Sequence, residues 1–115
     1  MNGFLTEVNI KYDMPPAETA IKRITYCIHS SRARGAAAVK IIHGYGSTGR
    51  GGKIRTEARR YLDSQVKRGL IKGYIRGEDF SIFDENTRRY FLLCGDLRLD
   101  EDLDAHNNGI TIVIL

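Results

Sequence analysis

Apolar and polar positions follow two different periods in the first third of the chain. Residues 7–12 (E-V-N-I-K-Y) alternate apolar and polar, which predicts a half-buried strand. After the prolines at 15–16, apolar residues recur at intervals of three and four, which predicts a helix that ends at Gly35. The apolar stripe of this helix consists of Ala17, Ala20, Ile21, Ile24, Cys27 and Ile28.

The middle of the chain repeats this order. Residues 38–43 predict a second strand, and a glycine-rich stretch at 44–52 follows it. Residues 53–68 have helical periodicity and end at Gly69, and residues 70–75 predict a third strand. Two strand–helix–strand crossovers imply parallel pairings and helices that cover the sheet.

The last third is less regular. Between 76 and 108 we expect a long excursion with a short helix near 84–95, followed by an acidic loop. The wholly apolar run at 110–115 predicts a closing strand. The order β-α-β-α-β-(α)-β therefore predicts a single α/β domain over residues 1–115.

Composition narrows the class of protein. With 115 residues, of which 42% are hydrophobic and 28% charged, the chain is long enough for one domain with its own core. It has no apolar run of bilayer length and no secretory signal pattern, so we expect no membrane association. Cys27 and Cys94 are too few for a disulfide framework, and we expect both to be buried thiols in a reducing, cytoplasmic setting.

Charge is distributed unevenly along the chain. Residues 36–75 hold nine basic and two acidic residues, whereas residues 76–115 hold four basic and nine acidic residues. A local excess of +7 attracts polyanions such as nucleic acid. The alternative is a solvated basic helix face without a partner. We expect the acidic group at 100–104 to form a solvated loop, although it could instead hold a divalent ion.

The glycine-rich stretch is the strongest functional feature. It follows a strand and precedes a helix, an arrangement in which backbone N–H groups and the helix N-terminus attract anions. We expect it to hold phosphate together with the basic helix. The predicted binding residues are Gly44, Tyr45, Gly46, Ser47, Thr48, Gly49, Arg50, Lys53, Arg55 and Arg59.

Two nucleotide motifs can be compared with this stretch. Gly44, Gly46 and Gly49 match the dinucleotide fingerprint by letters, but the chain is shorter than such folds require. The P-loop pattern fails, because Gly52 stands where a lysine is needed and Ile54 follows Lys53.

The run I-I-H-G-Y-G-S-T-G at 41–49, with Lys53, Ile54 and Arg55 entering a helix, resembles the H-G-x-G signature of the small MutS-related (Smr) domain family. The ending at 108–115 is similar to that family's closing G-x-T-x-V-x-L strand. This resemblance implies an α/β sandwich in which a four-stranded mixed sheet packs on two helices. It also implies binding of DNA or RNA, nuclease activity in many members, and protein partners in the repair or translation machinery.

The chain departs from the family at a second motif, L-D-x-H-G, which falls on residues 8–12. Asn9 stands for its acid and Lys11 for its histidine. Asn9 cannot act as a base, and a solvated lysine is protonated at neutral pH. Asp13 follows and either substitutes for the acid or caps the first helix.

His43 is the remaining catalytic candidate. It either transfers protons, donates to a phosphate when charged, or packs the loop through backbone hydrogen bonds. Lys11 is a second candidate, as an electrostatic stabiliser of the transition state. No metal-binding signature is present, and Mg²⁺ is implied only if the protein is a nuclease.

Three functions remain open. The first is a nucleic-acid-binding domain with weak or lost nuclease activity, which holds phosphates through the glycine loop and basic helix. The second is an active DNA or RNA endonuclease that uses His43. The third is a protein-interaction module that docks a partner at its sheet edge or acidic loop. Tyr45 is available to stack an unpaired base, whereas Tyr61 is expected in the core.

Overall fold

The computed structural model describes residues 3–45 and 49–115. The strands are β1 (Leu5–Asn9), β2 (Ala38–Ile42), β3 (Gly73–Arg76) and β4 (Ile110–Ile114). The helices are α1 (Ala17–Ala33), α2 (Gly49–Lys67) and α3 (Glu85–Phe91), and two short 3₁₀ turns, η1 (Gly77–Asp79) and η2 (Gly95–Leu99), flank α3. The order of strands and α-helices confirms the α/β fold predicted from the sequence.

The four strands form one mixed sheet in the order β1-β2-β4-β3. β1 pairs with β2 in parallel, whereas β4 is antiparallel to both of its neighbours, β2 and β3. The expectation that both crossovers lead to parallel pairs is therefore correct only for β1 and β2. The second crossover leaves a gap beside β2, and the closing strand fills it from the opposite direction.

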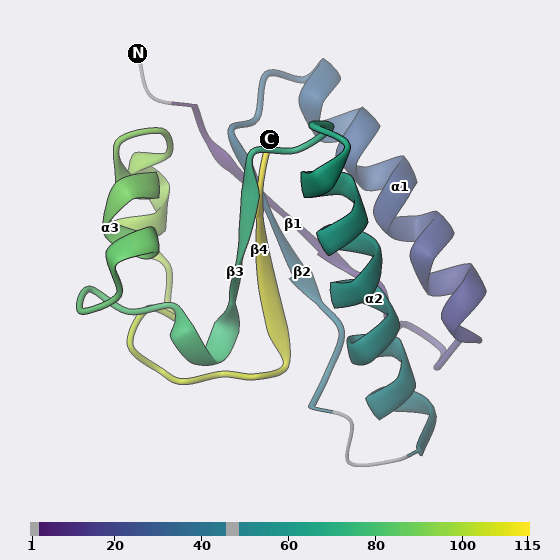
Figure 1. Cartoon of the computed structure of the whole chain (residues 1–115). Coiled ribbons are helices and arrows are strands. Elements are labelled where there is room, and N and C mark those ends of the chain that lie inside the picture. The colour runs from purple at the N-terminus through teal and green to yellow at the C-terminus, as the bar shows by residue number, and fades with distance from the viewer. Residues whose placement is uncertain (1–2, 46–48) are drawn as a thin grey trace.

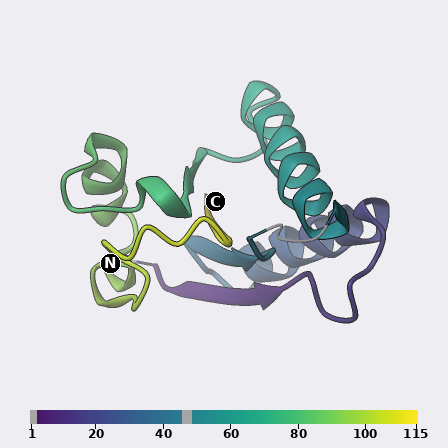
Figure 2. The same cartoon turned by 90° about the horizontal axis from the view of Figure 1, so that it is seen from below.

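The sheet separates two hydrophobic cores. On one face, β2 and β4 contribute Val39, Ile41 and Val113, which pack with the buried stripes of α1 and α2. On the other face, Ile110, Ile112 and Ile114 pack beneath the excursion that joins β3 to β4. Figure 1 shows α1 and α2 together on one side of the sheet and α3 on the other, and Figure 2 shows the same separation from below. The fold has a third layer in addition to the predicted sheet and helices.

α1 follows its sequence pattern closely. It begins directly after Pro16 and ends before Gly35, which has a φ of +86°. Ala20, Ile24 and Ile28 are buried, as the spacing predicts. Asp13 does not cap this helix, because Pro16 occupies the cap position and no side chain bonds there. The Asp13 carboxylate instead pairs with Arg23 at 3.3 Å.

α2 begins at Gly49, four residues before the predicted start. The glycines that suggested an extended loop therefore include part of the first helical turn. A glycine in a helix costs only about 1 kcal/mol relative to alanine, and packing of the buried stripe further along offsets this cost. Ile54, Ala58 and Leu62 form that stripe and are fully buried.

β1 ends earlier than the alternating pattern predicts. The side-chain oxygen of Asn9 accepts the backbone N–H of Lys11 at 3.0 Å, an Asx turn that diverts the chain out of the sheet. Ile10 remains buried, but Tyr12 is 73% exposed rather than half-buried. The turn then passes through Asp13, whose φ is +58°.

The excursion folds as a compact layer rather than an open link. The carboxylate of Asp84 accepts the backbone N–H of Thr87 and caps α3, close to the predicted helix start. Phe80, Phe91 and Leu97 are buried against the sheet. Cys94 is fully buried as expected, whereas Cys27 on α1 is only partly buried.

The expectation of a solvated acidic loop at 100–104 is wrong for two of its residues. Lys40 on β2 faces the third layer, is 2% exposed, and pairs with Asp100 at 3.1 Å and with Asp102. Burial acts to lower the pKa of Lys40, but the hydrogen bonds and charges of Asp102 and Asp100 outweigh it and raise the pKa. The acidic segment therefore neutralises a buried lysine and fastens the third layer to the sheet.

Among the described residues, no helix is both long enough and apolar enough to cross a membrane.

Candidate functional site

The loop that follows β2 meets the turn that precedes β4. The backbone N–H groups of His43 and Gly44 both donate to the carbonyl oxygen of Gly109, at 3.0 and 2.9 Å. Gly44 has a φ of +83°, a conformation that glycine adopts without strain. A Cβ at Gly109 would lie 3.4 Å from the Gly44 Cα, so the two segments are in close contact. The first residues of the glycine-rich loop are thereby anchored to the closing strand.

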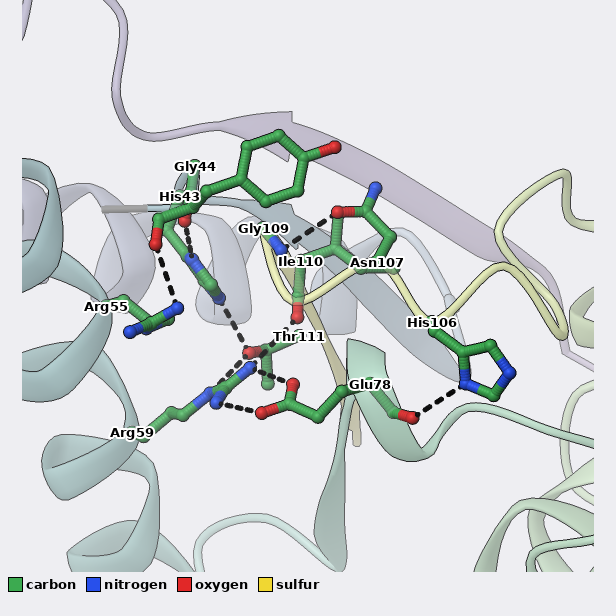
Figure 3. A network of polar contacts seen from close by, with 11 residues as sticks. His43, Gly44, Arg55, Arg59, Glu78, His106, Asn107, Gly109, Ile110 and Thr111 are labelled. Carbon is green, nitrogen blue, oxygen red and sulfur yellow. Dashed lines mark hydrogen bonds and ion pairs between the residues drawn. The ribbon is translucent and has the colours of Figure 1, made fainter. Parts of the chain in front are cut away.

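The side chain of His43 lies at the centre of a hydrogen-bonded chain (Figure 3). Its Nδ1 lies 3.0 Å from the carbonyl oxygen of Gly44, and its Nε2 lies 2.8 Å from the hydroxyl of Thr111. A carbonyl oxygen only accepts hydrogen bonds, so Nδ1 carries the proton and Nε2 accepts the Thr111 hydroxyl. Both ring nitrogens are therefore occupied within the protein.

His43 is held as a neutral imidazole. Its side chain is fully buried, and burial lowers its pKa from 6.5 to about 4, with further lowering from the positive charges of Arg59 and Arg55. The ring is therefore unprotonated at neutral pH. The hydrogen bonds of both ring nitrogens match the packing role among the three that the sequence left open. A role of His43 in catalysis or phosphate binding stays a prediction.

The chain of contacts continues from Thr111 to α2 and the third layer. The Nε–H of Arg59 donates to the Thr111 hydroxyl at 3.3 Å, and its two terminal nitrogens bind the carboxylate of Glu78 at 2.8 and 2.7 Å. Burial acts to raise the pKa of Glu78, but the hydrogen bonds and charge of Arg59 lower it overall. Glu78 therefore stays ionised and neutralises Arg59.

The predicted basic residues of α2 lie on different sides of the helix. Arg55 faces the loop and donates to the carbonyl oxygen of Tyr45 at 2.8 Å. Lys53 instead lines a hollow beside the start of α1, together with Glu18 and Glu57. Lys53 and Arg55 are two positions apart in the helix, which separates their side chains by about 200° around its axis. Of Lys53 and Arg55, it is Arg55 that lies close to both the glycine loop and Arg59.

The aromatic residues near the loop differ in exposure. Tyr45 is 62% exposed at the loop. Tyr61 packs against the core between the helices, and its hydroxyl lies 2.7 Å from that of Thr25 on α1. The expectation that Tyr61 belongs to the core is confirmed.

Lys11, the second catalytic candidate, lies beside the loop. A Cβ at Gly44 would be 3.2 Å from Cδ of Lys11, so the lysine stem passes along the loop backbone. Asn9 uses its side-chain oxygen in the turn that ends β1. The position of the degenerate motif thus adjoins the glycine loop, but neither residue supplies a carboxylate or an imidazole there.

Several predicted binding residues lie outside the described residues. Gly46, Ser47 and Thr48 fall in the gap between the two described ranges, and nothing is described of the Arg50 side chain. Within residues 3–45 and 49–115, no three His, Cys, Asp or Glu side chains are grouped closely enough to hold a metal ion.

Sequence reasoning missed the residues that join the site from other elements. Thr111 stands in the segment that resembles the family's closing strand, but its contact with His43 has no sequence signal, because the two are 68 positions apart. Glu78 was included only in the acidic count of residues 76–115, and its pairing with Arg59 was not predicted. A third group, Arg60 and Arg76, lines a polar groove of about 490 Å³ between α2 and β3, with Arg55 and Arg59 on the same walls.

A different hollow, of about 410 Å³, lies between α1 and the edge strand β1. Thr6 and Val8 line it from the strand, and Tyr26 and Cys27 from the helix. Tyr26 is 75% exposed. This groove is remote in sequence from the glycine loop and is lined by no residue of the His43 network.

Comparison with known proteins identifies one family. The sequence-family model of the Smr domain matches residues 15–78, which include α1, β2, the glycine loop, α2 and β3. No curated protein and no solved structure gives a significant match to the chain.

Proposed function

The chain belongs to the Smr domain family, and we propose that it is a nucleic-acid-binding domain that holds backbone phosphates and has weak or no nuclease activity. The observation that carries this proposal is the pairing of an exposed glycine-loop entrance with a buried, neutral histidine. At this entrance the N–H groups of His43 and Gly44 already donate to Gly109, so the phosphate contact is assigned to the neighbouring Arg55. The burial of His43 removes the predicted proton-transfer group from solvent.

Phosphate binding is supported by charge and by loop anchoring. The backbone at Gly44 is fixed by Gly109 and by the His43 ring, so the loop has a rigid base. Arg55 lies next to it, and no carboxylate of the described chain is within 4 Å of its guanidinium. Backbone contacts of this kind position a nucleic acid without reading its sequence. Tyr45 adds an exposed ring on which a base can stack.

Weak nuclease activity is supported by the state of each catalytic candidate. A general base must reach the proton that it removes, but both nitrogens of His43 are bonded internally. Asn9 has no acid–base chemistry, and Asp13 is engaged by Arg23. The stem of Lys11 passes the loop at Gly44, and a protonated lysine suits phosphate binding better than proton abstraction.

The proposal is tested by salt-dependent binding and cleavage of labelled single- and double-stranded DNA and RNA, with and without Mg²⁺. We expect binding that weakens linearly with the logarithm of salt concentration, and little or no cutting. The Arg55→Ala variant should bind more weakly and flatten the salt slope by roughly one unit for the lost contact, whereas Lys53→Ala, on the other side of α2, should leave the slope unchanged. Failure of the wild-type chain to bind any of the four substrates contradicts the proposal.

The endonuclease alternative predicts a different result. Robust cutting by the wild type that disappears in a folded His43→Gln variant would assign chemistry to His43. A Mg²⁺ requirement in the same assay would add a metal to that reaction.

A protein partner is the second candidate function, and the groove beside β1 favours it. As an edge strand, β1 offers unpaired backbone groups, and the adjoining groove is largely apolar with Lys22, Arg23 and Arg34 along its α1 side. We propose that this surface accepts an extended acidic segment of a partner protein of the repair or translation machinery. Tyr26→Glu should abolish capture of such a partner without changing nucleic-acid binding, whereas loss of both would contradict a separate surface.

A further inference from the structure

The groove between α2 and β3 has no assigned role in the proposal above. Its walls are formed by residues on one flank of α2 and by the edge strand β3 with the turn that follows it. They consist of Arg55, Thr56, Arg59, Arg60, Asp63, Tyr74, Arg76, Glu78 and Asn108. From Arg55 to Asp63 the helix advances about 12 Å at 1.5 Å per residue.

The groove has an excess of positive charge after its internal pairs are taken into account. Arg59 is neutralised by Glu78, and the carboxylate of Asp63 accepts the Tyr74 hydroxyl at 2.6 Å. Arg60 has a carboxylate partner at 3.0 Å, Glu57, but 72% of its own side chain is exposed. Such a pair contributes little in water and exchanges readily for another anion.

Arg76 completes the cationic surface from the opposite wall. Its side chain is exposed, and its charge lowers the pKa values of both Tyr74 and Glu78, although burial and other contacts dominate those two groups. No carboxylate of the described residues lies within 4 Å of the Arg76 guanidinium. Arginine binds phosphate through two parallel N–H groups, which suits a backbone passing between two walls.

The groove also opens towards the glycine loop. Arg55 lines the groove and at the same time donates to the carbonyl oxygen of Tyr45. A nucleic-acid backbone that leaves the loop therefore follows α2 on the side of Arg55, and not on the opposite side where Lys53 lies. The exposed Tyr45 ring at this end accepts an unpaired base by stacking.

We propose that this groove holds the backbone of a single nucleic-acid strand, with Arg60 and Arg76 as phosphate contacts beyond the glycine loop. The inference rests on the proposed nucleic-acid binding and extends it to a strand type and a path. A volume of about 490 Å³ accommodates groups of nucleotide size, and Thr56 and Asn108 offer neutral polar groups to base edges. A base can stack on Tyr45 only when it is not paired within a duplex.

The test compares two double variants with the same change in net charge. Arg60→Ala/Arg76→Ala removes the groove cations, and Arg88→Ala/Arg89→Ala removes two exposed cations from α3. Arg89 is a close match for Arg60, because it is also an exposed helical arginine paired with a glutamate. Binding of fluorescent 12-nucleotide single-stranded RNA, single-stranded DNA and the corresponding duplexes is followed by anisotropy across a salt series.

We expect the groove variant to bind both single strands about tenfold more weakly at low salt, with a salt slope reduced by about 1.4 units. The control variant should stay within about twofold of the wild type. Circular dichroism and urea midpoints confirm that both variants fold. Backbone amide NMR of the wild type should show the largest single-strand-induced shifts at Thr56, Tyr74 and Asn108.

Each contrary outcome has a defined meaning. If the groove variant binds like the control while Arg55→Ala weakens binding, the groove is not on the path and the proposed function stands. If a duplex binds more tightly and competes with the single strand, the assignment of a single strand is overturned. If the wild type binds none of the probes, the proposed function itself fails.

Discussion

The Nε2 atom of His43 lies 2.8 Å from the hydroxyl oxygen of Thr111, and both side chains are fully buried. This contact joins the end of β2 to β4 on the helix side of the sheet. Because Arg59 donates to the same hydroxyl, a single oxygen connects the loop, the sheet and α2. The network therefore fixes the position of the loop entrance, and its members are expected to act on stability before they act on chemistry.

Replacing Thr111 by valine should destabilise the protein by about 1–3 kcal/mol. The substitution preserves shape but leaves Nε2 of His43 without a donor, and an unsatisfied buried polar atom costs about this much. Urea unfolding followed by circular dichroism measures the difference. Thr111→Ser retains the hydroxyl and should lose less. Equal stability of the valine variant and the wild type would show that the hydrogen bond contributes nothing net.

Stability should fall as the pH falls from 6.5 to 4. Burial lowers the pKa of His43 to about 4 in the native protein, whereas an unfolded histidine has a pKa near 6.5. In this window the unfolded chain binds a proton that the native protein does not bind, so the free energy of unfolding decreases, by about 3 kcal/mol at most. Urea unfolding at several pH values measures this slope.

The matched control is His43→Gln, which should lack this part of the pH dependence. Imidazole proton resonances of the wild type provide a direct check, since the His43 ring should titrate near pH 4. A midpoint near 6.5 for this ring is incompatible with its burial as described.

Lys40→Met should destabilise the protein by about 3–5 kcal/mol. Methionine matches the aliphatic stem, but the change leaves the carboxylates of Asp100 and Asp102 close together without their cation. Hydrogen exchange should accelerate most in residues 77–108, because these carboxylates fasten the third layer. The exposed Lys22 is paired with Glu18 on one helix, and Lys22→Met should cost less than about 0.5 kcal/mol.

If the unpaired carboxylates cause the loss of stability in Lys40→Met, neutralising them should restore part of that stability. Adding Asp100→Asn and Asp102→Asn to Lys40→Met removes the unpaired charges, and we expect part of the stability to return. Failure of this triple variant to recover any stability would assign the effect of Lys40→Met to packing alone.

Gly77→Ala should destabilise the fold by about 3 kcal/mol or more. A Cβ at this position would lie 1.9 Å from the backbone oxygen of Asn107, so the chain before β4 must move. Gly69→Ala is the control: its φ is +71°, but nothing lies within 4 Å of the added Cβ. Strain alone should cost it about 1–2 kcal/mol. Thermal unfolding of both variants measures the contrast, and similar costs would contradict the close packing at Gly77.

The helices, and the order in which helices and strands follow one another along the chain, could be predicted from local patterns. α1 has a continuous apolar stripe between a proline start and a glycine stop, and these signals lie within the element itself. The start of α2 was misplaced because glycine has a low helix propensity, and propensity is overridden when a downstream stripe is buried. The place of β4 between β2 and β3 depends on pairing across the whole chain, which the crossover rules alone do not determine.

The site was predictable in composition but not in geometry. The glycine loop and its cations were found because they are contiguous in the sequence. The burial of His43 could not be predicted in this way, because it depends on Thr111 and on the turn at Gly109. The same holds for Lys40, whose partner Asp100 is 60 positions away. An ion pair between distant segments leaves no local pattern, so the acidic group at 100–104 was expected to form a solvated loop.

The central position of β4 has a consequence for biosynthesis. The ribosome makes residues 110–114 after every other strand, and until they emerge β3 has no neighbour and β2 has a free edge. The unit of β1, α1 and β2 can assemble while the chain is still growing, but α2 and the third layer have no complete sheet to pack on. Closure of both cores therefore waits for the same five residues, and a chain interrupted shortly before them exposes both apolar faces of the unfinished sheet at once.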